Sequence, residues 1–161
     1  MSSNESIEKR LAALGIELPP IFSAPAGMNF LTAMPATGPL LFLSGHGPTG
    51  SDGKVVYQGR VGKEVSFEQA YQAARLTGLN LLATIRQELG GLDRVTQIVK
   101  VLGMVNAVEG FEKQPQVING ASDLFVEVFG DKIGRHARSA IGVGSLPFNM
   151  PVEIEMIVQY A

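Results

Sequence analysis

The chain has 161 residues, of which 45% are hydrophobic and 17% are charged, with 13 Lys and Arg against 15 Asp and Glu. That length suits one domain with its own hydrophobic core, and a formal net charge of -2 without a basic run disfavours nucleic acid as a ligand. The sequence has no cysteine, which excludes disulfide frameworks, thiolate nucleophiles and cysteine metal ligands.

The N-terminal region is polar and charged, unlike a secretory signal peptide, and no apolar run reaches membrane-spanning length. We therefore expect a cytoplasmic protein without membrane contact. Within residues 4–14, Ile7, Leu11 and Leu14 recur at helical spacing before Gly15, which predicts a short leading helix. We expect this helix and a connector to occupy 1–25 and the core of a single domain to occupy 28–160.

The first strands are predicted at 30–33 and 40–44, joined as a hairpin through a turn at 37–39. A third short strand is predicted at 55–57, because the preceding Asp52 and Gly53 form a pair that readily adopts positive φ.

A long helix is predicted from Ser66 to Leu89, because Ser66 and Gln69 match a capping box and a pair of glycines follows. The stretch 97–105 is rich in β-branched and apolar residues without alternation, which indicates a strand covered on both faces. A second helix is predicted at 111–129. The last strands are expected at 139–143 and 152–160. Strands that open and close the domain around two long helices predict an α+β fold.

One glycine pattern suggests a nucleotide site. Gly45, Gly47 and Gly50 satisfy G-x-G-x-x-G after a predicted strand, and Glu68 lies near the spacing of a ribose-binding acid. A helix should follow such a loop directly and bind pyrophosphate at its N-terminus, whereas here Pro48 and further turn residues follow. We therefore favour a glycine-rich turn, which still allows a ligand to approach its backbone N–H groups.

The two histidines, His46 and His136, are far apart and have no acidic partner at ligand spacing, so a metal site is not expected. No G-x-S-x-G elbow is present. His46 is either a loop residue that caps or hydrogen-bonds the backbone or a catalytic histidine, and the sequence favours the first interpretation.

Arg138 lies at the start of a mostly apolar predicted strand, where a buried guanidinium needs an anionic partner. Physical reasoning alone favours an ion pair with Glu153 or Glu155, which share one side of their strand because side chains alternate. The alternative is that Arg138 faces a cleft and binds a ligand carboxylate in a bidentate manner.

Several separated blocks resemble the Rid (reactive intermediate deaminase) family, also called YjgF-like. They are 40–45 (LLFLSG), 137–139 (ARS), 146–147 (LP) and 152–155 (VEIE). The block 119–124 (NGASDL), the block 127–130 (EVFG) and the leading helix resemble a longer subgroup labelled endoribonuclease-like. The resemblance implies a chorismate-mutase-like mixed sheet with two helices on one face, assembled as a homotrimer with clefts between subunits.

Deaminating members of this family hydrolyse 2-imino or enamino acids to 2-oxo acids and ammonia without a cofactor or metal. The resemblance implies that Arg138 binds the substrate carboxylate and that Glu153 orients the attacking water, with Glu155 as the second candidate. The other expected ligand contacts are backbone groups of Gly45 and Ala140 and the side chains of Phe30, His46 and Asn119.

The chain departs from the family pattern at His46, where many members have glutamine, at Ala140, which replaces a common cysteine, and at Phe30, where tyrosine is frequent. These changes leave the substrate open, and His46 is a candidate proton carrier. Two other functions stay open: a non-catalytic trimer that binds 2-oxo acids as a regulator, and an endoribonuclease. Net negative charge and the lack of interleaved basic and aromatic residues disfavour the endoribonuclease.

Overall fold

The computed structural model describes residues 6–21 and 31–161, and its elements confirm the α+β prediction. The α-helices are α1 (Ile7–Ala13), α2 (Phe67–Leu89) and α3 (Gln114–Gly134), and short 3-10 turns occur at Leu92–Arg94 and Pro147–Asn149. The strands are β1 (Ala33–Pro35), β2 (Leu40–His46), β3 (Val95–Asn106), β4 (Ala137–Val143) and β5 (Val152–Tyr160). Within the described ranges, each helix is too short or too polar to cross a membrane.

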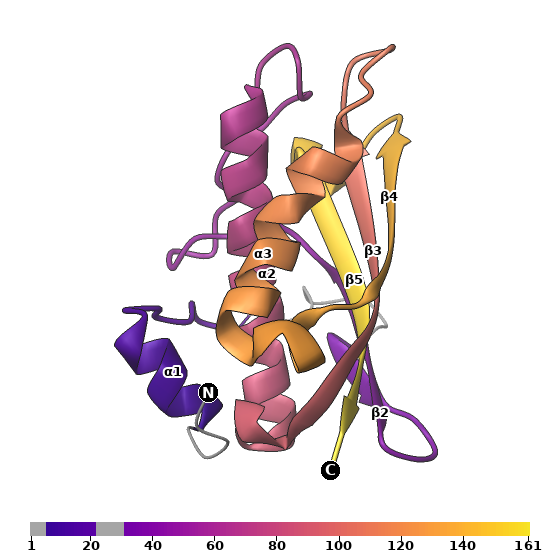
Figure 1. The fold of residues 1–161 in the computed structure, drawn as a ribbon. Coiled ribbons are helices and arrows are strands. Elements are labelled where there is room, and N and C mark those ends of the chain that lie inside the picture. The colour runs from indigo at the N-terminus through magenta and orange to yellow at the C-terminus, as the bar shows by residue number, and fades with distance from the viewer. Residues whose placement is uncertain (1–5, 22–30) are drawn as a thin grey trace.

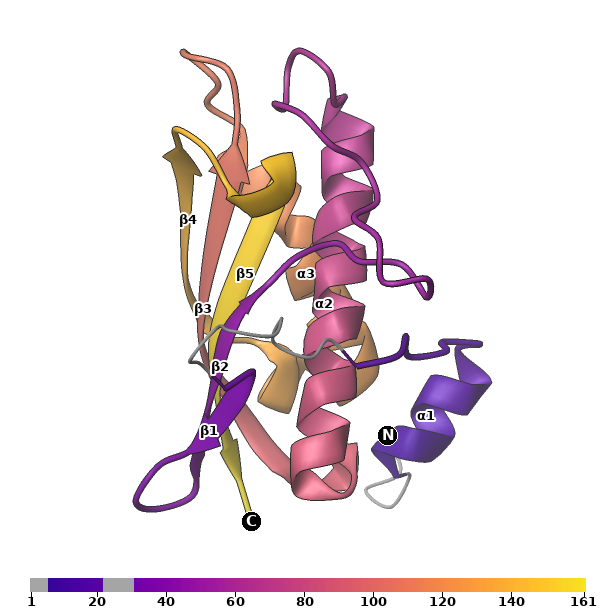
Figure 2. The ribbon, with the colours of Figure 1, turned by 180° about the vertical axis from the view of Figure 1, so that it is seen from behind.

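The five strands form one mixed sheet in the order β1-β2-β5-β3-β4. All neighbouring pairs are antiparallel except β3 and β4, which run parallel and are connected through α3. Helices α2 and α3 lie against each other on one side of the sheet, and the opposite side carries no helix of the described chain (Figure 1). The view from behind shows the same two layers, with α1 beside the lower half of α2 (Figure 2).

The start of α2 is fixed by the capping box that the sequence predicts. The Ser66 hydroxyl accepts from the N–H of Gln69, and the Gln69 side chain accepts from the N–H of Ser66. The helix ends at Gly90, whose φ of 75° is the left-handed conformation that glycine adopts without strain. Helix α3 carries Pro115 in its first turn, where a missing N–H costs nothing, so the helix begins later than the predicted residue 111.

The two faces of the sheet differ in burial. Along β5, Val152, Ile154, Met156 and Val158 are buried toward the helices, while residues between them point the other way. On the helix-free face, large apolar side chains stay exposed: Met34 by 62%, Phe42 by 44% and Ile141 by 45%. The prediction that 97–105 is covered on both faces is therefore wrong for a single chain, because only the helix side of β3 is buried.

The predicted strand at 55–57 is also wrong. Val55 forms one isolated bridge with Thr49, and the backbone then turns at Tyr57, whose φ of 62° cannot continue a strand. The first strand lies at Ala33–Pro35, slightly later than predicted. The predicted cleft residue Phe30 lies outside the described residues.

Candidate functional site

Arg138 is the second residue of β4 and faces the helices. It pairs with Val101 of β3, which is fully buried beneath them. The guanidinium reaches the first half of α3: Nη1 donates to Asn119 Oδ1 at 2.9 Å, and Nη2 donates to the carbonyl oxygen of Pro115 at 3.2 Å. Nη1 also donates to Ser122 Oγ at 3.0 Å. The arginine is thus held by one helix in a defined orientation.

All three acceptors of Arg138 are neutral oxygens. Among the described residues no Asp or Glu lies within ion-pair distance of its guanidinium, so the expected pair with Glu153 or Glu155 does not form there. Burial lowers the pKa of Arg138, and the charge of Asp123 acts in the opposite direction. A guanidinium has five N–H groups, so Nε and one N–H of Nη2 have no acceptor within the described chain. These donors suit an external anion.

His136 and Ser122 extend the contacts of Arg138, and sequence reasoning gave neither a role in the site. His136 Nε2 lies 3.0 Å from Ser122 Oγ, and its Nδ1 lies 2.7 Å from the carbonyl oxygen of Gly134. The ring also meets Phe125 edge to face. Two spacings could have revealed the group: Ser122 follows Asn119 by one helical turn, and His136 precedes Arg138 by two residues near the start of a strand.

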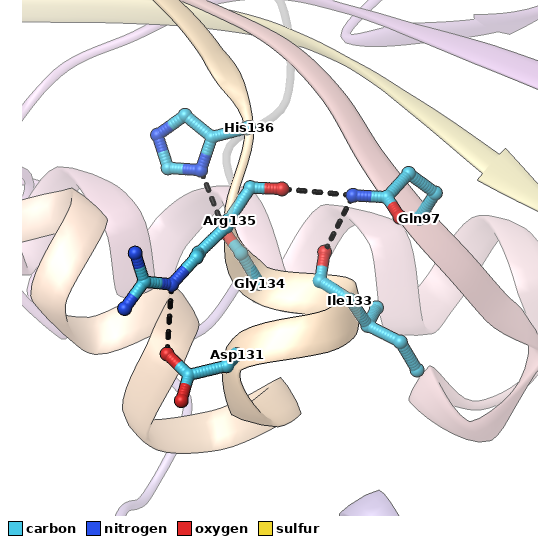
Figure 3. Close-up of polar contacts among 6 residues, drawn as sticks. All are labelled: Gln97, Asp131, Ile133, Gly134, Arg135 and His136. Atoms are coloured by element: carbon cyan, nitrogen blue, oxygen red, sulfur yellow. Dashed lines mark hydrogen bonds and ion pairs between the residues drawn. The ribbon is translucent and has the colours of Figure 1, made fainter.

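The junction between α3 and β4 is tied to β3 by Gln97, as Figure 3 shows. The side-chain amide of Gln97 donates to the carbonyl oxygens of Arg135 at 2.8 Å and Ile133 at 3.2 Å. Arg135 Nε donates to Asp131 at 2.8 Å, and His136 extends from the same junction toward Gly134 (Figure 3). The two bonds from Gln97 fix the point where β4 begins, and therefore the position of Arg138.

Glu153 lies on the helix-free face of the sheet, whereas Arg138 points to the face covered by the helices. Glu153 pairs with Met104 of β3, and its carboxylate packs on Gly45, where a Cβ would overlap Glu153 Oε1. Gly45 lies in an irregularity of the β2–β5 register between Leu43 and His46. Burial raises the pKa of Glu153, and the nearby charge of Glu155 raises it further. A raised pKa is a common property of a carboxylate that exchanges protons.

His46 faces the core. It is 2% exposed, its Nδ1 donates to the carbonyl oxygen of Ser44 at 2.7 Å, and its Nε2 lies 2.8 Å from Thr84 Oγ1 of α2. Burial lowers the pKa of His46, while the bond to Ser44 acts in the opposite direction. These contacts match the interpretation of a backbone-bonded histidine, although at the end of a strand rather than in a loop. The His46 ring faces α2, whereas Glu153 lies on the helix-free face.

The remaining expected residues divide between the two faces. Asn119 contacts Arg138 directly, and Ala140 pairs with Gly103 on the helix side. Glu155 is on the helix-free face, where it lines an open depression together with Lys100, Ser139, Phe42 and Ile157. One chain therefore does not place Arg138 and Glu153 on a common surface.

The described ranges contain neither a cluster of metal ligands nor a dinucleotide-binding loop. No three His, Cys, Asp or Glu side chains there are grouped closely enough to hold a metal ion. The glycines at 45, 47 and 50 are followed by turns, and the next helix begins at Phe67, so the glycine pattern does not form a dinucleotide-binding loop.

Comparison with known proteins gives consistent matches across the chain. Residues 8–159 match the family model described as "YjgF/chorismate mutase-like, putative endoribonuclease". Protein TCP17 of Trypanosoma cruzi is 38% identical over 153 residues, covering 95% of this chain and 93% of that protein. The protein Atu1372 of Agrobacterium tumefaciens, described as having unknown function, is 41% identical with a TM-score of 0.84, covering 96% of this chain and 91% of its own. A Shewanella oneidensis structure described as a "putative endoribonuclease" is 34% identical with a TM-score of 0.88, and the match covers 96% of this chain and 99% of that chain.

Proposed function

Since this chain belongs to the YjgF/chorismate mutase-like family, we propose that it hydrolyses reactive 2-imino or enamino acids to 2-oxo acids and ammonia. The observation that carries this proposal is the half-buried Arg138, which donates to neutral oxygens and has no acidic partner among the described residues. A cation held in this way has its charge available for a ligand carboxylate, the group common to all 2-imino and 2-oxo acids.

Nε and Nη2 of Arg138 lie along one edge of the planar guanidinium, and each keeps an N–H that no described residue accepts. That edge matches the two oxygens of a carboxylate. Asn119 and Ser122 occupy Nη1 and prevent the group from rotating. The substrate carboxylate would therefore be held in a defined orientation, which leaves its C=N carbon at a fixed place for attack.

Glu153 supplies the second part of the chemistry. Its raised pKa makes it a better proton acceptor than an ordinary glutamate. It would take a proton from water as the water oxygen bonds to the C=N carbon. The resulting tetrahedral intermediate receives that proton on nitrogen and becomes a neutral carbinolamine. Glu153 would then move the hydroxyl proton to nitrogen as the C–N bond breaks, so that ammonia leaves and the C=O bond forms. An enamino acid enters the same sequence after tautomerisation to the imine.

Arg138 and Glu153 lie on opposite faces of one sheet, so a site that uses both needs two copies of the chain. A homotrimer with its clefts between subunits satisfies this need. The exposed apolar side chains of the helix-free face, Met34, Phe42 and Ile141, support such an assembly because they would lose contact with water in it. No cofactor or metal has a part in this reaction.

A second candidate is a non-catalytic trimer that binds 2-oxo acids as a regulator, because the same arginine would hold their carboxylate. Ribonuclease activity, which the description of the Shewanella oneidensis relative suggests for that protein, suits this chain less well. Its net charge of -2 gives no long-range attraction for a polyanion.

The test generates 2-iminobutanoate in situ with a threonine dehydratase and measures its trapping by semicarbazide. Wild-type protein should reduce trapping, and Arg138→Ala should restore it to the level without protein. If neither protein changes trapping of this imine or of bulkier 2-imino acids, the deaminase proposal is wrong. The binding function would then be the better account if wild type still binds 2-oxobutanoate.

A further inference from the structure

We propose that Ser122 and His136 form a relay that positions the Arg138 guanidinium, with neutral His136 accepting the Ser122 hydroxyl proton and the Ser122 oxygen accepting from Arg138. This inference rests on the proposed role of Arg138 as the carboxylate-binding group. It assigns a positioning function to two residues that do not themselves contact the ligand.

The tautomer of His136 follows from its shorter contact. A carbonyl oxygen only accepts hydrogen bonds, so at 2.7 Å from Gly134 O the Nδ1 atom of His136 must carry a proton. In the neutral ring, Nε2 is then an acceptor. Burial lowers the pKa of His136, the bond to Gly134 acts in the opposite direction, and the charge of Arg138 lowers it again, so the net shift below 6.5 favours the neutral ring at physiological pH.

The direction of the next bond follows from this tautomer. Nε2 of His136 lies 3.0 Å from Ser122 Oγ and has no proton, so the Ser122 hydroxyl must donate to it. The Ser122 oxygen keeps its lone pairs for Nη1 of Arg138, which lies at 3.0 Å. If Nε2 of His136 carried the proton instead, it would not accept from Ser122. The Ser122 hydroxyl proton would then be free to point at Arg138, where it would repel the Nη1–H group.

The relay is anchored at its His136 end. The Gly134 carbonyl belongs to the α3–β4 junction, which Gln97 holds against β3 (Figure 3). The His136 ring is further fixed by Phe125, which contacts it edge to face. The charge of Arg138 acts on His136, and the charge of Asp123 acts on Arg138. Asp123 also accepts from the Tyr71 hydroxyl at 2.8 Å. The side chains of His136 and Ser122 thus connect the Arg138 guanidinium to the α3–β4 junction and hold it in place.

The test compares Ser122→Ala and Ser122→Thr, because threonine keeps the hydroxyl that alanine removes. Calorimetric titration with 2-oxobutanoate should show binding about five- to tenfold weaker for Ser122→Ala, the range expected for one net hydrogen bond, with much of it recovered in Ser122→Thr. His136→Phe should weaken binding to a similar extent. The double variant should be no weaker than either single variant, because both act through one chain of bonds. Exposed Lys132→Ala on the same helix is the control for general effects.

A second readout needs no ligand. The sequence has only two histidines, so nitrogen-15 NMR of the rings should resolve His136 with Nδ1 protonated and Nε2 unprotonated, and Ser122→Ala should shift the Nε2 resonance. A protonated Nε2 in the neutral ring, or Ser122→Ala binding within twofold of wild type, would overturn the relay. Should wild type bind no carboxylate while His136 shows the expected tautomer and shift, the hydrogen-bonded chain stands and only the proposed function of Arg138 fails.

Discussion

Arg138 on β4 and Asn119 on α3 are joined by a 2.9 Å hydrogen bond from Nη1 to Oδ1, which links the edge strand of the sheet to the helix covering it. Asn119 accepts this bond as a neutral amide. It therefore orients the guanidinium without cancelling its charge, and an aspartate of the same shape would cancel it. The difference between these two side chains is a direct probe of what the arginine does.

Asn119→Asp should weaken carboxylate binding while preserving the fold. The new carboxylate would pair with Arg138 within the chain, so a ligand would have to displace an internal ion pair. We expect at least a tenfold loss of affinity for 2-oxobutanoate, consistent with the roughly 1.5–3 kcal/mol of a hydrogen bond to a charged group. Thermal unfolding measured beside calorimetry distinguishes the two effects. Unaltered affinity in a folded Asn119→Asp protein would show that the ligand does not use this guanidinium.

Mixed assemblies should reveal whether one site uses two subunits. Arg138→Ala and Glu153→Gln should each be inactive in imine hydrolysis. When the two variants are refolded together in equal amounts, about one quarter of the sites should combine an intact arginine from one chain with an intact glutamate from its neighbour. Recovery of about that fraction of wild-type activity is expected. An inactive mixture that is shown to have exchanged subunits would place both residues within one chain's site and contradict the arrangement.

The buried His46 should make the protein less stable in mild acid. Because burial lowers its folded pKa below the ordinary 6.5, the unfolded chain binds a proton more readily than the folded one as pH falls below that value. The contribution of neutral His46 to the free energy of unfolding is then fully present above about pH 6.5, and it is lost as the pH falls through the folded pKa. Urea unfolding at pH 7.5 and 5.5 should show this loss for wild type and a smaller pH-dependent difference for His46→Gln. An equal pH dependence in both proteins would assign the loss to other groups.

Much of the fold follows from local sequence signals, and the misses have identifiable causes. The capping box at Ser66 and the apolar pattern of 152–160 predicted α2 and β5 because each signal lies within its own element. The strand predicted at 55–57 failed because a left-handed backbone at Tyr57 is not visible in residue type. The absence of alternation in 97–105 was attributed to two covered faces, whereas one of them is open in the single chain.

The site was predictable in its residues but not in its geometry. The resemblance selected Arg138 and Asn119, which do touch, and Glu153, which does not share their surface. Which face of a strand a side chain occupies depends on strand pairing and on the irregularity near Gly45, and neither is encoded in spacing alone. Ser122 and His136 were not assigned a role because their contact depends on how α3 packs on β4.

The most direct test of the central claim is calorimetric binding of 2-oxobutanoate to wild type, Arg138→Ala and Arg135→Ala. Arg135 is a matched control, since it lies three positions earlier, is largely exposed and already pairs with Asp131. We expect Arg138→Ala to weaken binding by roughly ten- to a hundredfold, the loss expected for a charge-assisted contact, while Arg135→Ala binds as wild type does. Equal affinity in all three proteins would contradict the claim that Arg138 holds the carboxylate.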